Sequence, residues 1–280
     1  MKGHGTAFGA GTVINAIASW KGCAFSIDMT TEATVEIGGD RIEGEIEGGG
    51  DTRLICRACE LVMEKFGAGP GAKISTASRI PMASGLKSSS AAANATTIAT
   101  LRALDKKMDP LDMVRLGVRA ALDSGVSVTG AFDDACASML GGIVATDNKK
   151  NELLRRDPFE SRVVIYAPDR QAFSSQTNVK RSRLMAPWVD MAFEMALKGD
   201  YKKAMALNGF LYTAALGFSP EPMLAALELG IEGVSLSGTG PSYVALVDEE
   251  SLGSLKDAWS KYPGRVIVTQ TNNRPAFSPE

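Results

Sequence analysis

The sequence predicts an α+β protein built as two lobes. Its 280 residues allow one large domain or two ordinary ones, and 45% of them are hydrophobic, enough for a sizeable core. Strand patterns occur in groups instead of alternating steadily with helices, which is typical of α+β architecture. A polar and charged run, residues 147–157, separates two such groups. We therefore expect one lobe over residues 1–150 and a second over residues 151–280.

The first lobe is expected to contain strands followed by helices. Residues 23–47 alternate in polarity like strands, and Gly38-Gly39-Asp40 favours a hairpin turn within them. Asp51 is placed to cap a helix that ends near Phe66, because glycines follow it. The remaining elements expected here are strands over 34–37, 41–46, 72–77 and 142–146, and helices from the serines at 88–90 to about 104, over 110–124 and over 132–140.

The second lobe is expected to mix helices and strands in the same way. Its strands are placed over 163–167, 233–237, 242–247 and 265–269, and its helices over 186–198, 200–216, 220–229 and 251–261. The turn Gly238-Thr239-Gly240-Pro241 joins two of these strands.

Charge and hydropathy argue against two large classes of partner. Thirty Lys and Arg against 32 Asp and Glu leave a net charge of −2, which gives no long-range attraction to nucleic acid or to an anionic membrane. The longest apolar stretch, residues 91–104, is interrupted by Asn94 and Arg102 and falls short of the roughly 20 residues that span a bilayer. No continuous apolar segment precedes Trp20, so no signal peptide is indicated. We expect a cytoplasmic protein that binds neither nucleic acid nor membrane.

Nucleophile and zinc chemistry are also disfavoured. The single histidine, His4, lies between glycines in a terminus expected to be mobile, whereas a catalytic base must be held rigidly. Cys56 and Cys59 have the spacing of a metal motif, but Cys59 lies on an apolar helical face and no second ligand pair follows. Four cysteines in a chain of this length are too few for a disulfide framework.

Residues 81–93 combine a strand exit, a glycine, three serines and a helix start. The first amides of a helix have no intrahelical partner and lie at the positive end of its dipole, so they form an anion site. Gly85 would let the backbone approach an anion closely, and Lys87 adds a positive charge. The alternative is an ordinary loop with serine caps. The absence of Asp and Glu between Arg79 and Leu104 favours a bound phosphate, because acids usually favour a helix start.

Two common nucleotide motifs are missing. No stretch has the G-x-x-x-x-G-K-[ST] pattern of a Walker A loop. Gly5, Gly9 and Gly11 do not have G-x-G-x-x-G spacing, and no strand is predicted before them. A dinucleotide-binding enzyme is therefore disfavoured.

Three segments resemble the motifs of the GHMP kinases, the family of galactokinase, homoserine kinase and mevalonate kinase. Residues 81–93 resemble the family's phosphate loop, usually Pro-x-x-x-Gly-Leu-Gly-Ser-Ser-Ala-Ala, residues 130–142 its segment with a catalytic aspartate, and residues 237–242 its C-terminal glycine motif. The likeness covers nearly the whole chain, and residues 10–17 and 130–135 are most similar to the archaeal-type shikimate kinase branch. It implies a ribosomal protein S5 domain 2-like N-terminal lobe and a ferredoxin-like C-terminal lobe.

The resemblance implies an ATP- and Mg²⁺-dependent kinase that phosphorylates the 3-hydroxyl of shikimate. Another GHMP kinase, with homoserine or mevalonate as acceptor, is the nearest alternative. A non-catalytic ligand-binding protein on the same fold is an alternative of another class. We expect a monomer or a homodimer.

The family's catalytic aspartate is matched by the pair Asp133 and Asp134. Adjacent residues on a helix point about 100° apart, so one of the two is expected to face the site. Counting back from Ser138 and Gly141 favours Asp134, and a helix cap is the alternative role for the pair. Asp123, 11 residues before Asp134, resembles the family's magnesium-binding acid, although a solvated acid at a helix end is nearly as plausible.

The resemblance also assigns residues to ATP and to the acceptor. Lys87 departs from the small residue usual in the family and is a further catalytic candidate, and the usual N-terminal motif is missing. ATP is expected to contact Pro81, Met82, Ala83, Ser84, Gly85, Leu86, Lys87, Ser88, Ser89, Ser90 and Ala91, with Ser89 also holding the metal. Because shikimate carries a carboxylate and several hydroxyls, arginine and short polar side chains are expected around it. The candidates are Thr12, Asn15, Thr129, Arg181, Gly238, Thr239, Gly240, Arg265 and Arg274.

Overall fold

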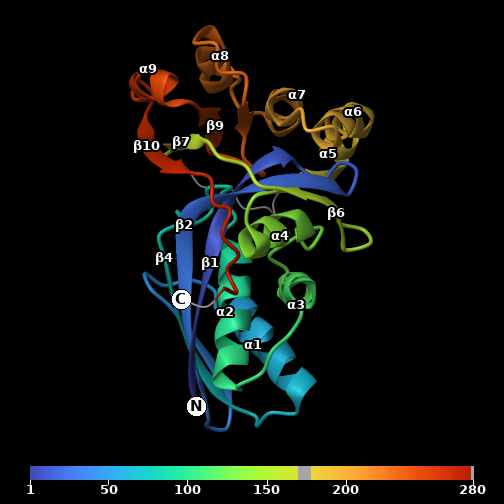
Figure 1. The fold of residues 1–280 in the computed structure, drawn as a ribbon, viewed down its shortest axis with the longest axis vertical. Helices are drawn as coiled ribbons and strands as arrows, with labels where there is room; N and C mark the ends of the chain where they lie inside the picture. The colour runs from blue at the N-terminus through green and yellow to red at the C-terminus, as the bar shows by residue number, and fades with distance from the viewer. Residues whose placement is uncertain (170–177, 279–280) are drawn as a thin grey trace.

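The protein has an α+β architecture with two β-sheets (Figure 1). The structure is a computed structural model, and it describes residues 1–169 and 178–278. The first sheet contains β1 (Lys2–Ile14), β2 (Lys21–Ile37), β3 (Ile42–Ile46), β4 (Ala72–Ser78), β5 (Ile143–Asp147) and β6 (Glu152–Asp157). The helices between these strands are α1 (Arg53–Phe66), α2 (Ser88–Ala103), α3 (Pro110–Asp123) and α4 (Phe132–Leu140).

The glycine-rich N-terminus is a strand, and the expectation of a mobile terminus is wrong. Residues 2–14 pair with β2 along their whole length, and His4 Nδ1 lies 2.9 Å from Thr34 Oγ1. A Cβ at Gly3 would overlap the backbone of α2 at Ala99 O, and one at Gly5 would overlap Ala95 O. The glycines therefore allow α2 to pack directly against β1, which is why they lack the alternation of an ordinary strand.

The hairpin predicted at residues 38–40 does not form. β4 lies between the two strands that were expected to pair, in the order β3-β4-β2. β3 pairs with β4 in parallel, with Gly44 opposite Ile74, and β2 pairs with β4 antiparallel, with Val35 opposite the same residue. Parallel strands need a crossover, and α1 supplies it between β3 and β4. Tertiary pairing thus overrides a local turn signal.

The polar run of residues 147–157 contains a strand that was not predicted. β6 pairs antiparallel with β5, and its residues alternate between exposed and half-buried, as in an edge strand. Residue 150 lies in the turn of this hairpin, and the chain enters the second sheet at Arg162. The division into lobes at residue 150 remains a prediction.

The second sheet is antiparallel, in the order β10-β7-β9-β8, and helices pack against it. Its strands are β7 (Arg162–Pro168), β8 (Val234–Leu236), β9 (Tyr243–Val247) and β10 (Gly264–Gln270). Its helices are α5 (Val179–Arg183), α6 (Ala186–Leu197), α7 (Tyr201–Leu216), α8 (Glu221–Glu228) and α9 (Glu249–Trp259). Apart from α5, each matches a predicted element to within a few residues. Among the helices that the structure describes, none has the length and apolar character needed to cross a bilayer.

Candidate active site

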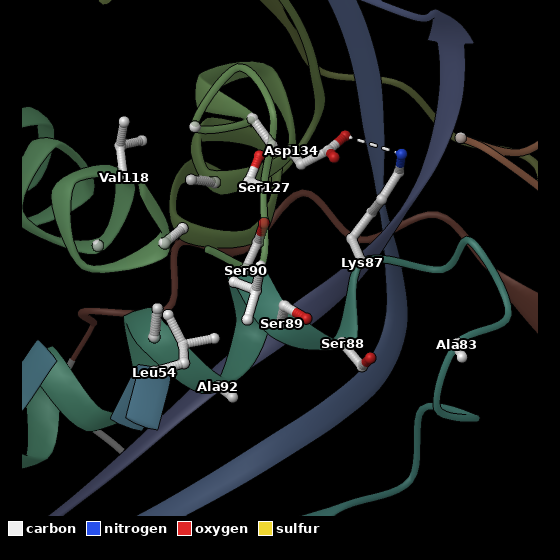
Figure 2. A pocket seen from close by; sticks show the side chains of 18 of the residues that line it. Leu54, Ala83, Lys87, Ser88, Ser89, Ser90, Ala92, Val118, Ser127 and Asp134 are labelled. Carbon is white, nitrogen blue, oxygen red and sulfur yellow. Dashed lines mark ion pairs between the residues drawn. The ribbon is translucent and has the colours of Figure 1, made fainter. Parts of the chain in front are cut away.

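A cavity of about 450 Å³ lies where α1, α2, α3, the start of α4 and the turn at Gly238 converge. Leu54 of α1 and Val118 of α3 give one part of it an apolar wall, as Figure 2 shows. Lys87 and Asp134 lie at the other side of the first turn of α2 and carry opposite charges (Figure 2). The cavity therefore joins an apolar compartment to a charged one.

The N-terminus of α2 opens into this cavity. Ala91 N–H donates to Lys87 O at 3.1 Å, and the three amides before it are helix-start amides, which have no intrahelical acceptor. Ser88, Ser89 and Ser90 line the cavity and are half-buried or exposed. The first turn contains no acidic residue. Free amides, hydroxyls and the helix dipole together give this helix start the features of an anion site, and its binding of phosphate stays a prediction.

The two glycine motifs pack against each other at the edge of the site. Gly85 has a φ of 81°, and a Cβ there would overlap Ser237 O. Ser237 Oγ donates to Gly85 O at 2.9 Å, and Ser242 N–H donates to Ser84 O at 3.2 Å. The glycine is thus required by contact with the second sheet as well as by its backbone conformation.

Thr12 and Asn15 hold the second glycine motif in place. Gly238 N–H donates to Thr12 Oγ1 at 2.8 Å, and Asn15 Nδ2 donates to Gly238 O at 2.8 Å. Both side chains are buried, and Thr12 lies outside the cavity lining. Contact between Thr12 and an acceptor hydroxyl is therefore not supported, because its oxygen faces the turn. Asn15 does line the cavity, but its amide already bonds within the protein.

Lys87 and Asp134 form an ion pair inside the cavity. Lys87 Nζ lies 3.1 Å from Asp134 Oδ1, and the side chains are 9% and 13% exposed. The pKa of Asp134 is raised to about 7: burial raises it most, Lys87 lowers it, and the adjacent Asp133 carboxylate raises it. Lys87 adopts a left-handed conformation, with a φ of 66°, as the residue that precedes α2. A carboxylate with this pKa can exchange a proton near neutral pH.

Asp133 is 4% exposed and, like Asp134, lines the cavity, but its carboxylate is bonded within the protein. Asn148 Nδ2 donates to Asp133 Oδ1 at 2.7 Å, and a Cβ at Gly22 would overlap Asp133 Oδ2. Burial raises the pKa of Asp133, while Lys87 and the hydrogen bond from Asn148 oppose that rise. Both carboxylates line the cavity and Asp134 is the one that pairs with Lys87, so the preference for Asp134 stays a prediction. Asn148 was missed by sequence reasoning, because it lies in the polar run interpreted as a boundary.

The loop residues expected to contact ATP divide into three groups. Met82, Ala83, Gly85 and residues 87–90 line the cavity. Pro81 and Ser84 line a separate cavity behind the loop, and Leu86 and Ala91 are buried in the core. The acceptor candidates Gly238, Thr239 and Thr129 line the main cavity, whereas Gly240 packs on Phe218 instead.

Comparison with known proteins identifies the family. The family model described as "GHMP kinases N terminal domain" matches residues 53–142, and "GHMP kinases C terminal" matches residues 179–264. The chain belongs to the GHMP kinases. The predicted α+β GHMP kinase fold is therefore confirmed, and this protein is a kinase by family.

Relatives of this GHMP kinase are known at high identity. A shikimate kinase of Methanocella arvoryzae is 71% identical over 99% of this chain and 96% of the relative. A shikimate kinase of Halobacterium salinarum is 45% identical over 97% of both chains. Solved structures of Methanococcus jannaschii mevalonate kinase and Cytophaga hutchinsonii homoserine kinase match with TM-scores of 0.76 and 0.73. They are 18% and 20% identical, cover 97% and 98% of this chain and 98% and 96% of their own, and therefore show the fold alone.

The position of Asp123 in this GHMP kinase does not fit the expected metal role. Its carboxylate accepts a hydrogen bond from Arg57 Nε at 2.8 Å, lies 3.8 Å from Arg119 Nε, and is outside the cavity lining. Asp123 thus links α3 to α1 through an ion pair at the surface. Among the residues that the structure describes, no group of three His, Cys, Asp or Glu could hold a metal. Ser89 remains a candidate for a metal carried by a nucleotide, because Mg²⁺ usually binds through phosphates and water.

The three candidate arginines do not line the cavity. Arg181 Nη2 donates to Ala214 O on α7, and Arg274 pairs with Asp28 and lies over the Phe8 ring. Arg265 lines the separate cavity behind the phosphate loop. Within the described ranges, the cations of the main cavity are Lys87 and Arg53, and Arg53 is paired with Asp51. No signal in the sequence distinguished Arg53, because its position depends on how α1 packs.

Proposed function

We propose that this GHMP kinase transfers the γ-phosphoryl group of ATP to the 3-hydroxyl of shikimate, producing ADP and shikimate 3-phosphate. The site observation that carries this proposal is the Lys87–Asp134 pair beside the open start of α2. The curated shikimate kinases, 45–71% identical over 95% or more of the chain, support the choice of acceptor.

The start of α2 would bind the triphosphate. The amides and hydroxyls of Ser88, Ser89 and Ser90 present donors to phosphate oxygens, and the helix dipole favours their charge. The apolar wall formed by Leu54 and Val118 would cover the nucleoside. Ser89 would contact the Mg²⁺ carried by the nucleotide, and bound Mg²⁺ neutralises phosphate charge during transfer.

Asp134 would hold the acceptor hydroxyl and take its proton. The hydroxyl oxygen attacks the γ-phosphorus, the bond to the β–γ bridging oxygen breaks, and the electron pair leaves with ADP. A pKa of about 7 allows Asp134 to be charged at neutral pH and still accept a proton efficiently. Lys87 would offset the charge of the transferring group, since it lines the cavity directly before α2 and its ammonium lies 3.1 Å from Asp134 Oδ1, where the hydroxyl would be held.

An acceptor panel tests the proposal. Purified protein with Mg-ATP is assayed for ADP release with shikimate, homoserine and mevalonate, and the product is identified by phosphorus NMR. We expect ADP release with shikimate and a 3-phosphate monoester. Turnover of another alcohol with none of shikimate would contradict the acceptor assignment. Nucleotide binding without any turnover would instead support a non-catalytic protein.

Three further properties remain predictions of the same proposal. The cytoplasm is the expected compartment, a monomer or homodimer is the expected assembly, and residues 1–150 and 151–280 are the expected lobes. The contact between Gly85 and Ser237 supports a site that needs both lobes together.

A further inference from the structure

Asn148 occupies a buried position directly behind the acidic pair. It follows β5 and is 3% exposed. Its N–H donates to Trp20 O at 2.8 Å, which ties the turn after β5 to the connection between β1 and β2. The backbone of Asn148 is thus held by β5, which it follows, and by the hydrogen bond to Trp20.

The amide of Asn148 binds Asp133 at two points. Asn148 Nδ2 donates to Asp133 Oδ1 at 2.7 Å, and Asn148 Oδ1 accepts from Asp133 N–H at 3.2 Å. Thr146 Oγ1 donates to the same Asn148 Oδ1 at 2.7 Å, which fixes the orientation of the amide. The side chains of Asn148, Thr146 and Asp133 are all buried, and each has a hydrogen-bond partner.

The hydrogen bonds from Asn148 take the place of a side-chain cap at the start of α4. Ala131, the residue that precedes α4, provides no side-chain cap, so the amide of Asp133 is one of the orphan donors of the first turn. Asn148 accepts that donor from another part of the chain. With Asp133 held against Gly22, the next residue of the helix is turned by about 100°. That direction brings Asp134 to Lys87 in the cavity.

We propose that Asn148 is the positioning residue of the transfer site: by binding Asp133 through its side-chain amide, it fixes the first turn of α4 and the direction of the Asp134 carboxylate. The inference rests on the proposed phosphoryl transfer but not on which alcohol is the acceptor. Asn148 is outside the cavity lining and bonds to Asp133, so it acts through the acidic pair.

The same contact links Asn148 to the protonation of Asp134. The groups that face Asp133 are Lys87 and Asp134, together with three neutral groups, the thiols of Cys23 and Cys136 and the phenol of Tyr212. The hydrogen bond from Asn148 lowers the pKa of Asp133 and so favours its charged form. A charged Asp133 opposes ionisation of Asp134. Loss of the amide therefore lets Asp133 become neutral and lowers the pKa of Asp134.

Asn148→Ala tests this, with Thr146→Val as the matched control. We expect Asn148→Ala to lower kcat about 10- to 100-fold, because a displaced group loses its alignment, with KM for ATP changed less than about 3-fold. The acid limb of the pH–rate profile should move to lower pH. Thr146→Val removes one bond to the amide but leaves both bonds to Asp133, so kcat should change less than about 3-fold. Unchanged kcat and an unchanged profile in Asn148→Ala would overturn the proposal.

An exchange of the two side chains separates positioning from a structural role. Asp133→Asn keeps the shape but removes the charge, and it should move the titration of Asp134 to lower pH. Adding Asn148→Asp restores an amide–carboxylate pair in reverse and should move that titration back. Carbon NMR of the carboxyl groups measures both shifts without substrate, so the test holds if Asn148→Ala does not fold or if shikimate is not the acceptor. A titration of Asp134 that is unmoved in Asp133→Asn, or that does not move back when Asn148→Asp is added, would also overturn the proposal.

Discussion

The starts of α2 and α4 meet at the cavity and differ in what their first turns carry. Each follows a residue in a left-handed conformation, Lys87 with a φ of 66° and Ala131 with a φ of 52°, and neither residue caps its helix with a side chain. The first turn of α2 has serines and no acid. The first turn of α4 has Asp133 and Asp134, and Asn148 accepts one of its amides.

This difference shows how one local structure can serve two chemical roles. Free amides at α2 attract a negative group, because the helix dipole is not offset by a carboxylate. At α4 the carboxylates already occupy that field, and burial raises the pKa of Asp134 until it can exchange a proton near neutral pH. Lys87 lies between the two and pairs with Asp134. The two helix starts together have the chemistry that the proposed transfer needs, a site for a phosphate and an acceptor for a proton.

The largest effect should come from the α4 side of the comparison. Asp134→Asn keeps the shape of the side chain but removes its charge and its ability to take a proton. We expect kcat to fall by about 10²-fold or more, while the dissociation constant for ATP changes only a few-fold. Steady-state kinetics and calorimetry measure the two quantities. A variant with full activity would remove Asp134 from the proton-transfer role.

The second-largest effect on kcat should come from Lys87, the cation that precedes α2 and pairs with Asp134 of α4. Lys87→Met removes the charge that lowers the pKa of Asp134, so that pKa should rise. The wild-type rate should fall as the pH drops through about 7, because protonated Asp134 cannot accept a proton. In the variant the same fall should occur at higher pH, and kcat at neutral pH should drop about tenfold or more. A profile unchanged in midpoint would show that the ion pair does not act in the working enzyme.

A smaller effect should follow from the contact that shapes the α2 side. Gly85→Ala places a Cβ against Ser237 O at a φ of 81°, and we expect a loss of about 1–3 kcal/mol in the free energy of unfolding. KM for ATP should rise as well, because the loop must shift. Gly67→Ala is the control, since Gly67 has a φ of 62° but no neighbour within 4 Å. Urea unfolding that gives equal losses for both variants would show that the contact with Ser237 costs nothing.

The smallest effect has opposite signs for stability and for binding. Ser89→Asp places an acid in the first turn of α2, where it should stabilise the unliganded protein by about 0.3–1 kcal/mol through the helix dipole. The same charge should weaken ATP binding, because it occupies the anion site. Thermal unfolding and calorimetry test the two signs, with Ser89→Ala as the neutral control. Tighter ATP binding in Ser89→Asp would show that α2 does not hold the triphosphate.

Some parts of the site could be predicted because their signals are local. Three serines without acids at a helix start indicate an anion site, and the structure leaves that start open. The spacing back from Gly141 selected Asp134 over Asp133, which agrees with the ion pair to Lys87. The roles of these residues in transfer stay predictions.

Other parts depended on contacts between distant segments and could not be predicted. Thr12 lies outside the cavity because its hydroxyl accepts from Gly238, more than two hundred residues away. Asp123 is held by Arg57, and that pairing depends on how α3 packs against α1. The hairpin at residues 38–40 failed for the same reason, since β4 pairs between its two strands.

The order of residues alone determined the helix starts, the anion-binding character of residues 88–90 and the acidic pair, because each arises from backbone groups and side chains within one turn. Tertiary structure decided which carboxylate pairs with Lys87, because the partner of Asp133, Asn148, lies in a different part of the chain. It also decided the protonation of Asp134, since burial is the main cause that raises its pKa and burial exists only in the folded chain.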